Sequence, residues 1–276
     1  MICFPCAKIN IGLHVTGKRD DGYHNLETLF YPVPLVDILE IIPLSGKRTV
    51  RNIFNSTGIR FDENTETNLC LQAWKEMNKT EPLPPVNIHL HKIIPVGAGL
   101  GGGSSDAASA LIALNDLFNI NMNKTVLASL AAGIGSDCPF FIYNKPMFAS
   151  GRGEVLQDTG IDLSGYKVVI VYPGKGISTA WAFSNIEIRE HNSSLRDTLN
   201  NDPATWQGKV FNDFETVVFK SYPEISSLKE KLLDNGALYA SLTGSGSAVY
   251  GLYDSGTATD HLRSVFPGMF FWEGKL

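Results

Sequence analysis

Five glycines lie between Gly97 and Gly103, and two serines, Ser104 and Ser105, follow them directly. A loop without Cβ atoms lets backbone N–H groups approach a ligand closely, and the start of a helix adds unpaired donors and a partial positive charge. We therefore predict that the stretch binds an anion, with a polyphosphate as the best fit. The alternative is a glycine-rich turn that only caps a helix.

The segment after the glycines is predicted to be a buried helix. Apolar side chains recur at helical spacing from Ser104 to Phe118. Ser104 or Ser105 is the expected N-cap, and Asp106 falls favourably in the first turn.

Spacing separates this loop from two better-known phosphate loops. A Walker A loop requires a Lys before the final Ser or Thr, and none precedes Ser104 or Ser105. Gly97, Gly99 and Gly102 satisfy the dinucleotide fingerprint, but that motif also requires an acidic residue about twenty positions on. Residues 119–124 read NINMNK instead, so we interpret the match as accidental.

Residues 7–15 alternate between apolar and polar side chains, which indicates a strand buried on one face. Lys8 and Asn10 share the other face, so a cation and a carboxamide are grouped there. The alternative is a solvated sheet face, which is the usual place for a lysine.

Three further places in the sequence carry side chains that could bind a ligand or take part in catalysis. Tyr23 and His24 follow a turn and could stack on a planar ligand such as a base, or lie in a surface loop. Asp137 lies on a turn before Pro139, where it is either a catalytic carboxylate or a helix N-cap. His89 and His91 lack a third metal ligand, so we expect a solvated strand face.

The composition excludes several classes of function. The chain has 276 residues, a net charge of −5 and no basic stripe, so we expect no nucleic-acid partner. Its four cysteines are scattered, and the Cys3-x-x-Cys6 pair favours packing over a metal half-site. No signal-peptide pattern or membrane-spanning run is present, which predicts a cytoplasmic protein without a membrane partner.

Alternating elements predict an α+β fold. The expected strands cover 36–42 and 48–54 around a Ser45-Gly46 turn, then 86–92, a hairpin at 147–159, 166–172, two strands within 237–253, and 269–273. Residues 243–247, between the two strands of 237–253, are either a plain hairpin turn or a second set of backbone donors that faces the first glycine loop. The expected helices cover 68–78, 125–132, 212–220, 224–235 and 258–265, beside the one from Ser104. Residues 174–186 are expected to be a loop and 189–207 mostly surface. A seam at 160–165 divides the chain into domains 1–159 and 160–276.

Three stretches together resemble the GHMP kinases, in the same order and at a similar separation. They are AKINIGLHVTGKRDDGYH from Ala7, PVGAGLGGGSSDAA from Pro95 and SLTGSGSAVYG from Ser241. GSDCPFF, which contains Asp137, and the segment FNDFE from Phe211 to Glu215 strengthen the resemblance. It spans nearly the whole chain and is weakest at 186–207.

The resemblance implies a two-domain GHMP kinase architecture. An N-terminal ATP-binding domain and a C-terminal ferredoxin-like α+β sandwich would enclose the active site in a cleft. It also implies transfer of the γ-phosphoryl of ATP, with Mg²⁺ whose protein ligands are not assigned, to the 2-hydroxyl of a CDP-linked methylerythritol. The enzyme is expected to be a monomer or a weak homodimer.

The resemblance implies a role for each candidate site residue. Lys8 and Asp137 are the expected catalytic pair, the lysine offsetting charge on the phosphoryl group and the carboxylate accepting the hydroxyl proton. The residues expected to bind ATP are Pro95, Val96, Gly97, Ala98, Gly99, Leu100, Gly101, Gly102, Gly103, Ser104, Ser105, Asn68 and Lys92. Those expected to bind the alcohol substrate are Asn10, Tyr23, His24, Thr179, Phe183, Gly244 and Ser245.

Two alternatives keep the scaffold and change the function. One is another GHMP kinase, acting on mevalonate, homoserine or a sugar. An aromatic clamp of Tyr23, His24 and Phe183 favours a base over a small aliphatic alcohol. The other alternative is a catalytically silent nucleotide-binding protein, which the presence of Lys8 and Asp137 disfavours.

Overall fold

The computed structural model describes residues 1–44, 51–61, 67–191 and 193–276. The chain forms two compact units, each assembled from separate segments. The first unit contains Met1–Ala7, Leu35–Pro95 and Gly101–Lys145, and the second contains Lys8–Pro34, Val96–Leu100 and Pro146–Leu276. The predicted division at 159/160 stays a prediction.

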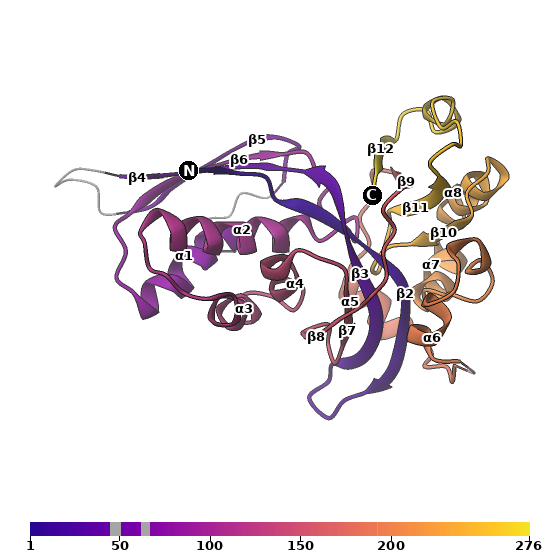
Figure 1. The fold of residues 1–276 in the computed structure, drawn as a ribbon, viewed down its shortest axis with the longest axis horizontal. Coiled ribbons are helices and arrows are strands. Elements are labelled where there is room, and N and C mark those ends of the chain that lie inside the picture. The colour runs from indigo at the N-terminus through magenta and orange to yellow at the C-terminus, as the bar shows by residue number, and fades with distance from the viewer. Residues whose placement is uncertain (45–50, 62–66, 192) are drawn as a thin grey trace. The chain divides into compact units, whose positions relative to one another are not determined.

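The first unit is a four-stranded sheet with helices on one face (Figure 1). The sheet order is β1-β4-β6-β5, with β1 at Ile2–Cys3, β4 at Ile38–Pro43, β5 at Ile53–Gly58 and β6 at Val86–Lys92. The helices are α1 (Leu69–Thr80), α2 (Gly102–Leu117), α3 (Lys124–Ala132) and α4 (Cys138–Tyr143). The expected Ser45-Gly46 turn lies outside the described residues.

Local sequence explains most of these elements. In β6, Val86, Ile88 and Leu90 are buried while the residues between them are half-exposed, as the alternation predicts. Asn68 caps α1 by accepting hydrogen bonds from two first-turn amides, and Asn123 caps α3 by accepting one from the amide of Val126. These local side chains therefore determine where the two helices begin.

The second unit contains two four-stranded sheets. One has the order β2-β3-β7-β8, with β2 at Cys6–Lys18, β3 at His24–Val36, β7 at Met147–Ser150 and β8 at Val155–Asp158. The other has the order β10-β11-β9-β12, with β9 at Tyr166–Tyr172, β10 at Tyr239–Leu242, β11 at Val249–Asp254 and β12 at Phe270–Lys275. The predicted hairpin at 147–159, the two strands predicted within 237–253 and the central position of β9 are confirmed.

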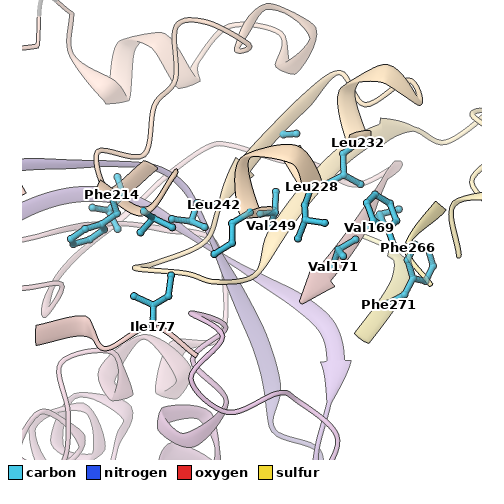
Figure 2. Close-up of a cluster of buried hydrophobic side chains, with 14 of the residues drawn as sticks. Val169, Val171, Ile177, Phe214, Leu228, Leu232, Leu242, Val249, Phe266 and Phe271 are labelled. Carbon is cyan, nitrogen blue, oxygen red and sulfur yellow. The ribbon is translucent and has the colours of Figure 1, made fainter. Parts of the chain in front are cut away.

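Helices α5 (Thr179–Asn185), α7 (Phe214–Ser221), α8 (Pro223–Asp234) and α9 (Leu262–Val265) pack with the C-terminal sheet. Helix α6 (Leu195–Leu199) lies against the other sheet, where Arg196 donates to Gln157 of β8 at 2.9 Å, and a 3₁₀ turn covers Pro203–Thr205. Figure 2 shows Leu228 and Leu232 of α8 packed with Val169, Val171 and Val249 of the strands in one apolar core. Burying this surface is the main stabilising contribution to the unit.

One prediction about the second unit is wrong. Residues 174–186 contain helix α5, whose N-cap Ser178 accepts a hydrogen bond from the amide of Trp181. The polar stretch 189–207 is mostly surface, as predicted, although Leu195, Leu199 and Trp206 within it are buried. Their apolar side chains anchor an otherwise polar segment to the core.

Strand β2 also differs from its prediction, because both of its faces are buried. Lys8, Asn10 and His14, on the polar face, are each 4 % exposed or less, so the alternative of a solvated face is wrong. The hydroxyl of Tyr250 donates to the backbone oxygen of Asn10 at 2.8 Å, and Leu13 pairs with the backbone of residues 211–213. Partners far along the chain therefore satisfy the polar groups of this strand.

Candidate active site

The glycine loop has the backbone that its composition predicts. Gly97, Gly99 and Gly101 all have positive φ angles, of 71°, 82° and 72°, which residues with a Cβ rarely adopt. Gly101 is the N-cap of α2, so the predicted cap at Ser104 or Ser105 is wrong. The left-handed Gly101 lets the helix begin at Gly102, and both serines fall inside its first turns.

The two serines of the loop have different surroundings within the first unit. The hydroxyl of Ser104 is hydrogen-bonded to the thiol of Cys138. Ser105 is 1 % exposed and lines a cavity of about 420 Å³ bounded by α2, α3 and α4. The phosphate-binding role of each serine stays a prediction.

Asp106 is buried and does not serve as the predicted first-turn acid. Its carboxylate accepts from the ammonium of Lys92 at 2.7 Å, and that ammonium also pairs with Asp37 at 2.5 Å. Burial raises the pKa of Asp106 to about 7, with the neighbouring Asp37 acting in the same direction and Lys92 against it. A Cβ on Gly102 would lie 2.8 Å from the Lys92 ammonium, so this ion triad packs directly under the start of α2.

Two predicted nucleotide-binding residues thus have defined structural contacts. The Asn68 carboxamide caps α1, and the Lys92 ammonium pairs with two buried carboxylates. Contact of either side chain with adenosine stays a prediction.

The two glycine-rich loops meet within the second unit. The amide of Ala248 donates to the oxygen of Ala98 at 3.1 Å, and the Thr243 hydroxyl donates to the oxygen of Gly99 at 3.2 Å. A Cβ on Gly99 would lie 2.0 Å from the backbone oxygen of Thr243. The alternative in which the second loop faces the first is confirmed, and this contact requires glycine at position 99.

Lys8 reaches the same loop from β2. Its ammonium donates to the oxygen of Gly99 at 3.0 Å and to Oδ1 of Asn10 at 2.5 Å, and its backbone amide donates to the oxygen of Leu100. The Asn10 amide group donates in turn to the hydroxyl of Thr28 at 3.0 Å. The cation and the carboxamide singled out in the sequence therefore contact one another and the glycine loop.

The candidate base-binding residues lie together in the second unit. The rings of His24 and Phe183 are stacked, with centroids 5.0 Å apart, and Phe183 also packs edge-on against Phe214 at 4.9 Å. Tyr23 is 56 % exposed, and the guanidinium of Arg152 lies 4.9 Å above its ring. Partial burial and the nearby Lys18 lower the pKa of His24, which favours its neutral ring.

Thr179 begins helix α5, and its hydroxyl is 3.1 Å from that of Ser245 in the second glycine-rich loop. Ser245 is 8 % exposed. The structure thus joins two of the predicted substrate-binding positions, and their contact with substrate stays a prediction.

Asp137 lies in the first unit, at the N-terminus of α4, where it is half-buried. Asp137 is the N-cap residue of α4, with Pro139 in the first turn, as the capping alternative expects, but its side chain accepts no capping hydrogen bond. The neighbouring Cys138 is fully buried, and burial raises the pKa of its thiol to about 12. A thiol with so little thiolate reacts slowly, so modification at this position is disfavoured.

Three residues outside the predicted set organise the second unit around the loops. They are Thr28, Thr243 and Asn212, each 1 % exposed or less. The Asn212 carboxamide donates to the oxygens of Leu242 and Gly244, both at 2.9 Å. Two of the three lie in motifs already noted in the sequence, Asn212 in FNDFE and Thr243 in the second glycine-rich loop. Nothing in the local sequence singles out Thr28.

Neither a metal-binding cluster nor a membrane-spanning helix is found among the described residues. No group of three His, Cys, Asp or Glu side chains is arranged to hold a metal ion. No described helix is long and apolar enough to cross a bilayer.

Two family models match the chain and define its class. The GHMP kinases N terminal domain matches residues 68–145, and the GHMP kinases C terminal domain matches residues 190–267. The mevalonate kinase of Methanococcus jannaschii shares the fold, with a TM-score of 0.70 at 16% identity over 100% of this chain and 98% of that one. This protein is a GHMP kinase, and its class uses ATP as the phosphoryl donor.

Closer relatives narrow the class. A protein of Parabacteroides distasonis, named 4-diphosphocytidyl-2-C-methyl-D-erythritol kinase, is 43% identical over 100% of both chains. A Bacteroides fragilis protein of the same name is 46% identical over 92% of both. A crystal structure of 4-(cytidine 5'-diphospho)-2C-methyl-D-erythritol kinase gives a TM-score of 0.80 at 29% identity, covering 99% of this chain and 98% of that one. The chain belongs to the 4-diphosphocytidyl-2-C-methyl-D-erythritol kinase family.

Proposed function

We propose that this chain transfers the γ-phosphoryl group of ATP to the 2-hydroxyl of 4-diphosphocytidyl-2-C-methyl-D-erythritol. The supporting observation is the contact of the Lys8 ammonium with the oxygen of Gly99, which brings a buried cation to the glycine loop. The identity of the alcohol follows from the names of relatives that match the whole chain. The proposal places the enzyme in isoprenoid precursor synthesis by the methylerythritol phosphate route.

The chemistry assigned to each residue follows from what phosphoryl transfer requires. Alignment and charge stabilisation supply most of the acceleration in this reaction. Backbone amides of the glycine loop bind the phosphate oxygens, and Lys8 offsets charge on the group in transit. Asp137 accepts the proton of the attacking hydroxyl.

Mg²⁺ enters this proposal as part of the nucleotide substrate. No carboxylate-rich cluster among the described residues fits a resident metal, and Mg²⁺ commonly keeps water and phosphate oxygens as ligands. We therefore assign it no protein ligand and no separate step.

The cytosine is proposed to bind at His24, Tyr23 and Phe183. In the structure the rings of His24 and Phe183 already stack on each other at 5.0 Å. That spacing accommodates one ring-to-ring contact, so a base inserted here must separate the two rings. Cytosine binding would replace a contact that protein side chains make with each other in its absence.

The test is a coupled ADP-release assay of the wild-type protein with Mg²⁺, ATP and five alcohols. These are 4-diphosphocytidyl-2-C-methyl-D-erythritol, methylerythritol phosphate, mevalonate, homoserine and galactose. We expect turnover of the first only, because the others lack a base for the aromatic site. Equal turnover of methylerythritol phosphate, or preference for one of the last three, would reverse the substrate assignment. ATP binding without turnover of any alcohol would point to a silent nucleotide-binding protein.

The expected cytoplasmic location and the monomer or weak dimer belong with this proposal. Sedimentation velocity measures the oligomeric state directly.

A further inference from the structure

Thr243 lies at the point where β2 and the two glycine-rich loops meet. It is fully buried, and its hydroxyl accepts from the backbone amide of Asn10 at 3.1 Å. The same hydroxyl lies 3.2 Å from the oxygen of Gly99 and 3.4 Å from Oδ1 of Asn10, as a donor to either.

The Lys8 ammonium donates to the same two oxygens. Its distances are 3.0 Å to the oxygen of Gly99 and 2.5 Å to Oδ1 of Asn10. Two donors, one from each end of the chain, therefore share one pair of acceptors. An ammonium has three N–H groups on a flexible stem, so the positions of its acceptors decide where it lies.

Each acceptor is fixed by further contacts. The Asn10 carboxamide keeps Oδ1 toward Lys8 because its amide group donates to Thr28, whose hydroxyl donates on to the oxygen of Gly12. The Gly99 oxygen belongs to a left-handed residue in close contact with the backbone of Thr243. Beside the Lys8 ammonium itself, the hydroxyl of Thr243 lies within hydrogen-bond distance of both acceptors.

We propose that Thr243 is a positioning residue for Lys8, whose hydroxyl fixes the two oxygens that orient the ammonium toward the phosphoryl group. This inference rests on the proposed role of Lys8 in phosphoryl transfer. This role differs from merely holding the two glycine-rich loops together, because loss of such a link would affect every part of the site equally.

The chain allows a matched pair of variants. Thr243→Val keeps the shape of the side chain and removes the hydroxyl, whereas Thr243→Ser keeps the hydroxyl and removes one methyl group. We expect kcat to fall about ten-fold for Thr243→Val and to stay within about three-fold of wild type for Thr243→Ser. Thr259→Val, which alters a buried threonine outside this network, controls for the loss of a buried hydroxyl and should leave kcat within about two-fold.

A double-mutant cycle with Lys8→Met separates positioning from tethering. If Thr243 acts through Lys8, then Thr243→Val lowers kcat in the wild-type background. In a protein that already carries Lys8→Met, adding Thr243→Val should leave kcat unchanged. The same fold loss in both backgrounds, or no loss in either, would overturn the inference.

An independent measurement needs no turnover. In protein labelled with ¹³Cε-lysine, the Lys8 signal, assigned by its loss in Lys8→Met, should shift in Thr243→Val and stay in place in Thr243→Ser. The Lys92 signal is the internal control and should stay in place in both. An unmoved Lys8 signal would overturn the inference. If the wild type phosphorylates a different alcohol, the proposed substrate fails, while the cycle with that alcohol and the lysine spectra still decide the role of Thr243.

Discussion

The Lys8 ammonium lies 3.0 Å from the carbonyl oxygen of Gly99, 91 residues further along the chain. A buried cation from the first long strand thereby contacts the loop expected to bind the nucleotide. In isolation a lysine on an alternating strand indicates a solvated face, and a glycine cluster indicates a turn. Their contact is what makes each a candidate for phosphoryl-transfer chemistry.

Gly99→Ala should damage the site by separating the two glycine-rich loops. The new Cβ would lie 2.0 Å from the oxygen of Thr243, at a φ of +82° that L-residues rarely adopt. We expect KM for ATP to rise at least about ten-fold and the melting temperature to fall.

Gly103→Ala is the matched stability control for that variant. Position 103 is helical, and its Cβ would meet only Leu69 at 3.4 Å. We expect unchanged or higher stability, by up to about 1 kcal/mol, from the better helix former. A Gly99→Ala protein as stable as Gly103→Ala would contradict the loop contact.

Asp137→Asn should separate chemistry from binding. The amide cannot accept the hydroxyl proton, so we expect kcat to fall by roughly 10²-fold or more. The dissociation constant for ATP, measured by calorimetry, should change little. Asp116→Asn replaces an exposed carboxylate of α2 and should behave as wild type. An undiminished kcat in Asp137→Asn would remove the general-base role.

The ion triad predicts that two of its variants differ in how much they change the free energy of unfolding. Lys92→Met leaves Asp37 and Asp106 buried without their shared cation, which costs about 3–5 kcal/mol. Asp106→Asn removes a carboxylate whose pKa burial raises to about 7 and whose Oδ1 has no hydrogen-bond partner. It should change the free energy of unfolding by about 1 kcal/mol or less.

Urea unfolding measures both changes. If Lys92→Met instead unfolds like the wild type and raises KM for ATP, then Lys92 contacts the nucleotide rather than stabilising the first unit.

The burial of His14 predicts how the free energy of unfolding depends on pH. Its ring stacks on that of His191 at 3.5 Å, and burial lowers its pKa to about 4, with His191 acting in the same direction and Asp213 against it. From pH 6.5 down to about 4, the unfolded chain binds a proton that the folded protein does not, so stability falls as the pH falls.

His14→Phe keeps a ring against His191 and removes this titration. Its free energy of unfolding should therefore vary less between pH 6.5 and 4, measured by urea unfolding at several pH values. His261→Phe, at an exposed position, should keep the wild-type dependence. An equal dependence in His14→Phe would show that other groups cause the acid loss.

The local sequence predicted the elements that local chemistry determines. Asn68 and Asn123 begin helices where their side chains can accept first-turn amides. The alternation in β6 and the glycines of the 147–159 hairpin were equally informative, because each reports the conformation of its own residues.

Features that depend on distant partners could not be predicted in this way. Lys8 and Asn10 are buried because acceptors and donors from residues 28, 99, 243 and 250 satisfy them. Helix α5 was missed because its seven residues are too few to show a period. For the candidate site, the sequence indicated the residue types, while the hydrogen bonds around Lys8 are formed only in the folded chain, by residues far apart in the sequence.

The hydrogen bond from Tyr250 to Asn10 spans 240 residues and also constrains how the protein is made. A ribosome produces β2 early, but the side chains that pair with the backbone of Asn10, those of Thr243 and Tyr250, emerge only near the end of translation. Until then this part of β2 lacks its C-terminal partners, and an incompletely packed strand favours aggregation. We expect chaperone dependence in the cell to be greatest for nascent chains that stop short of residue 250.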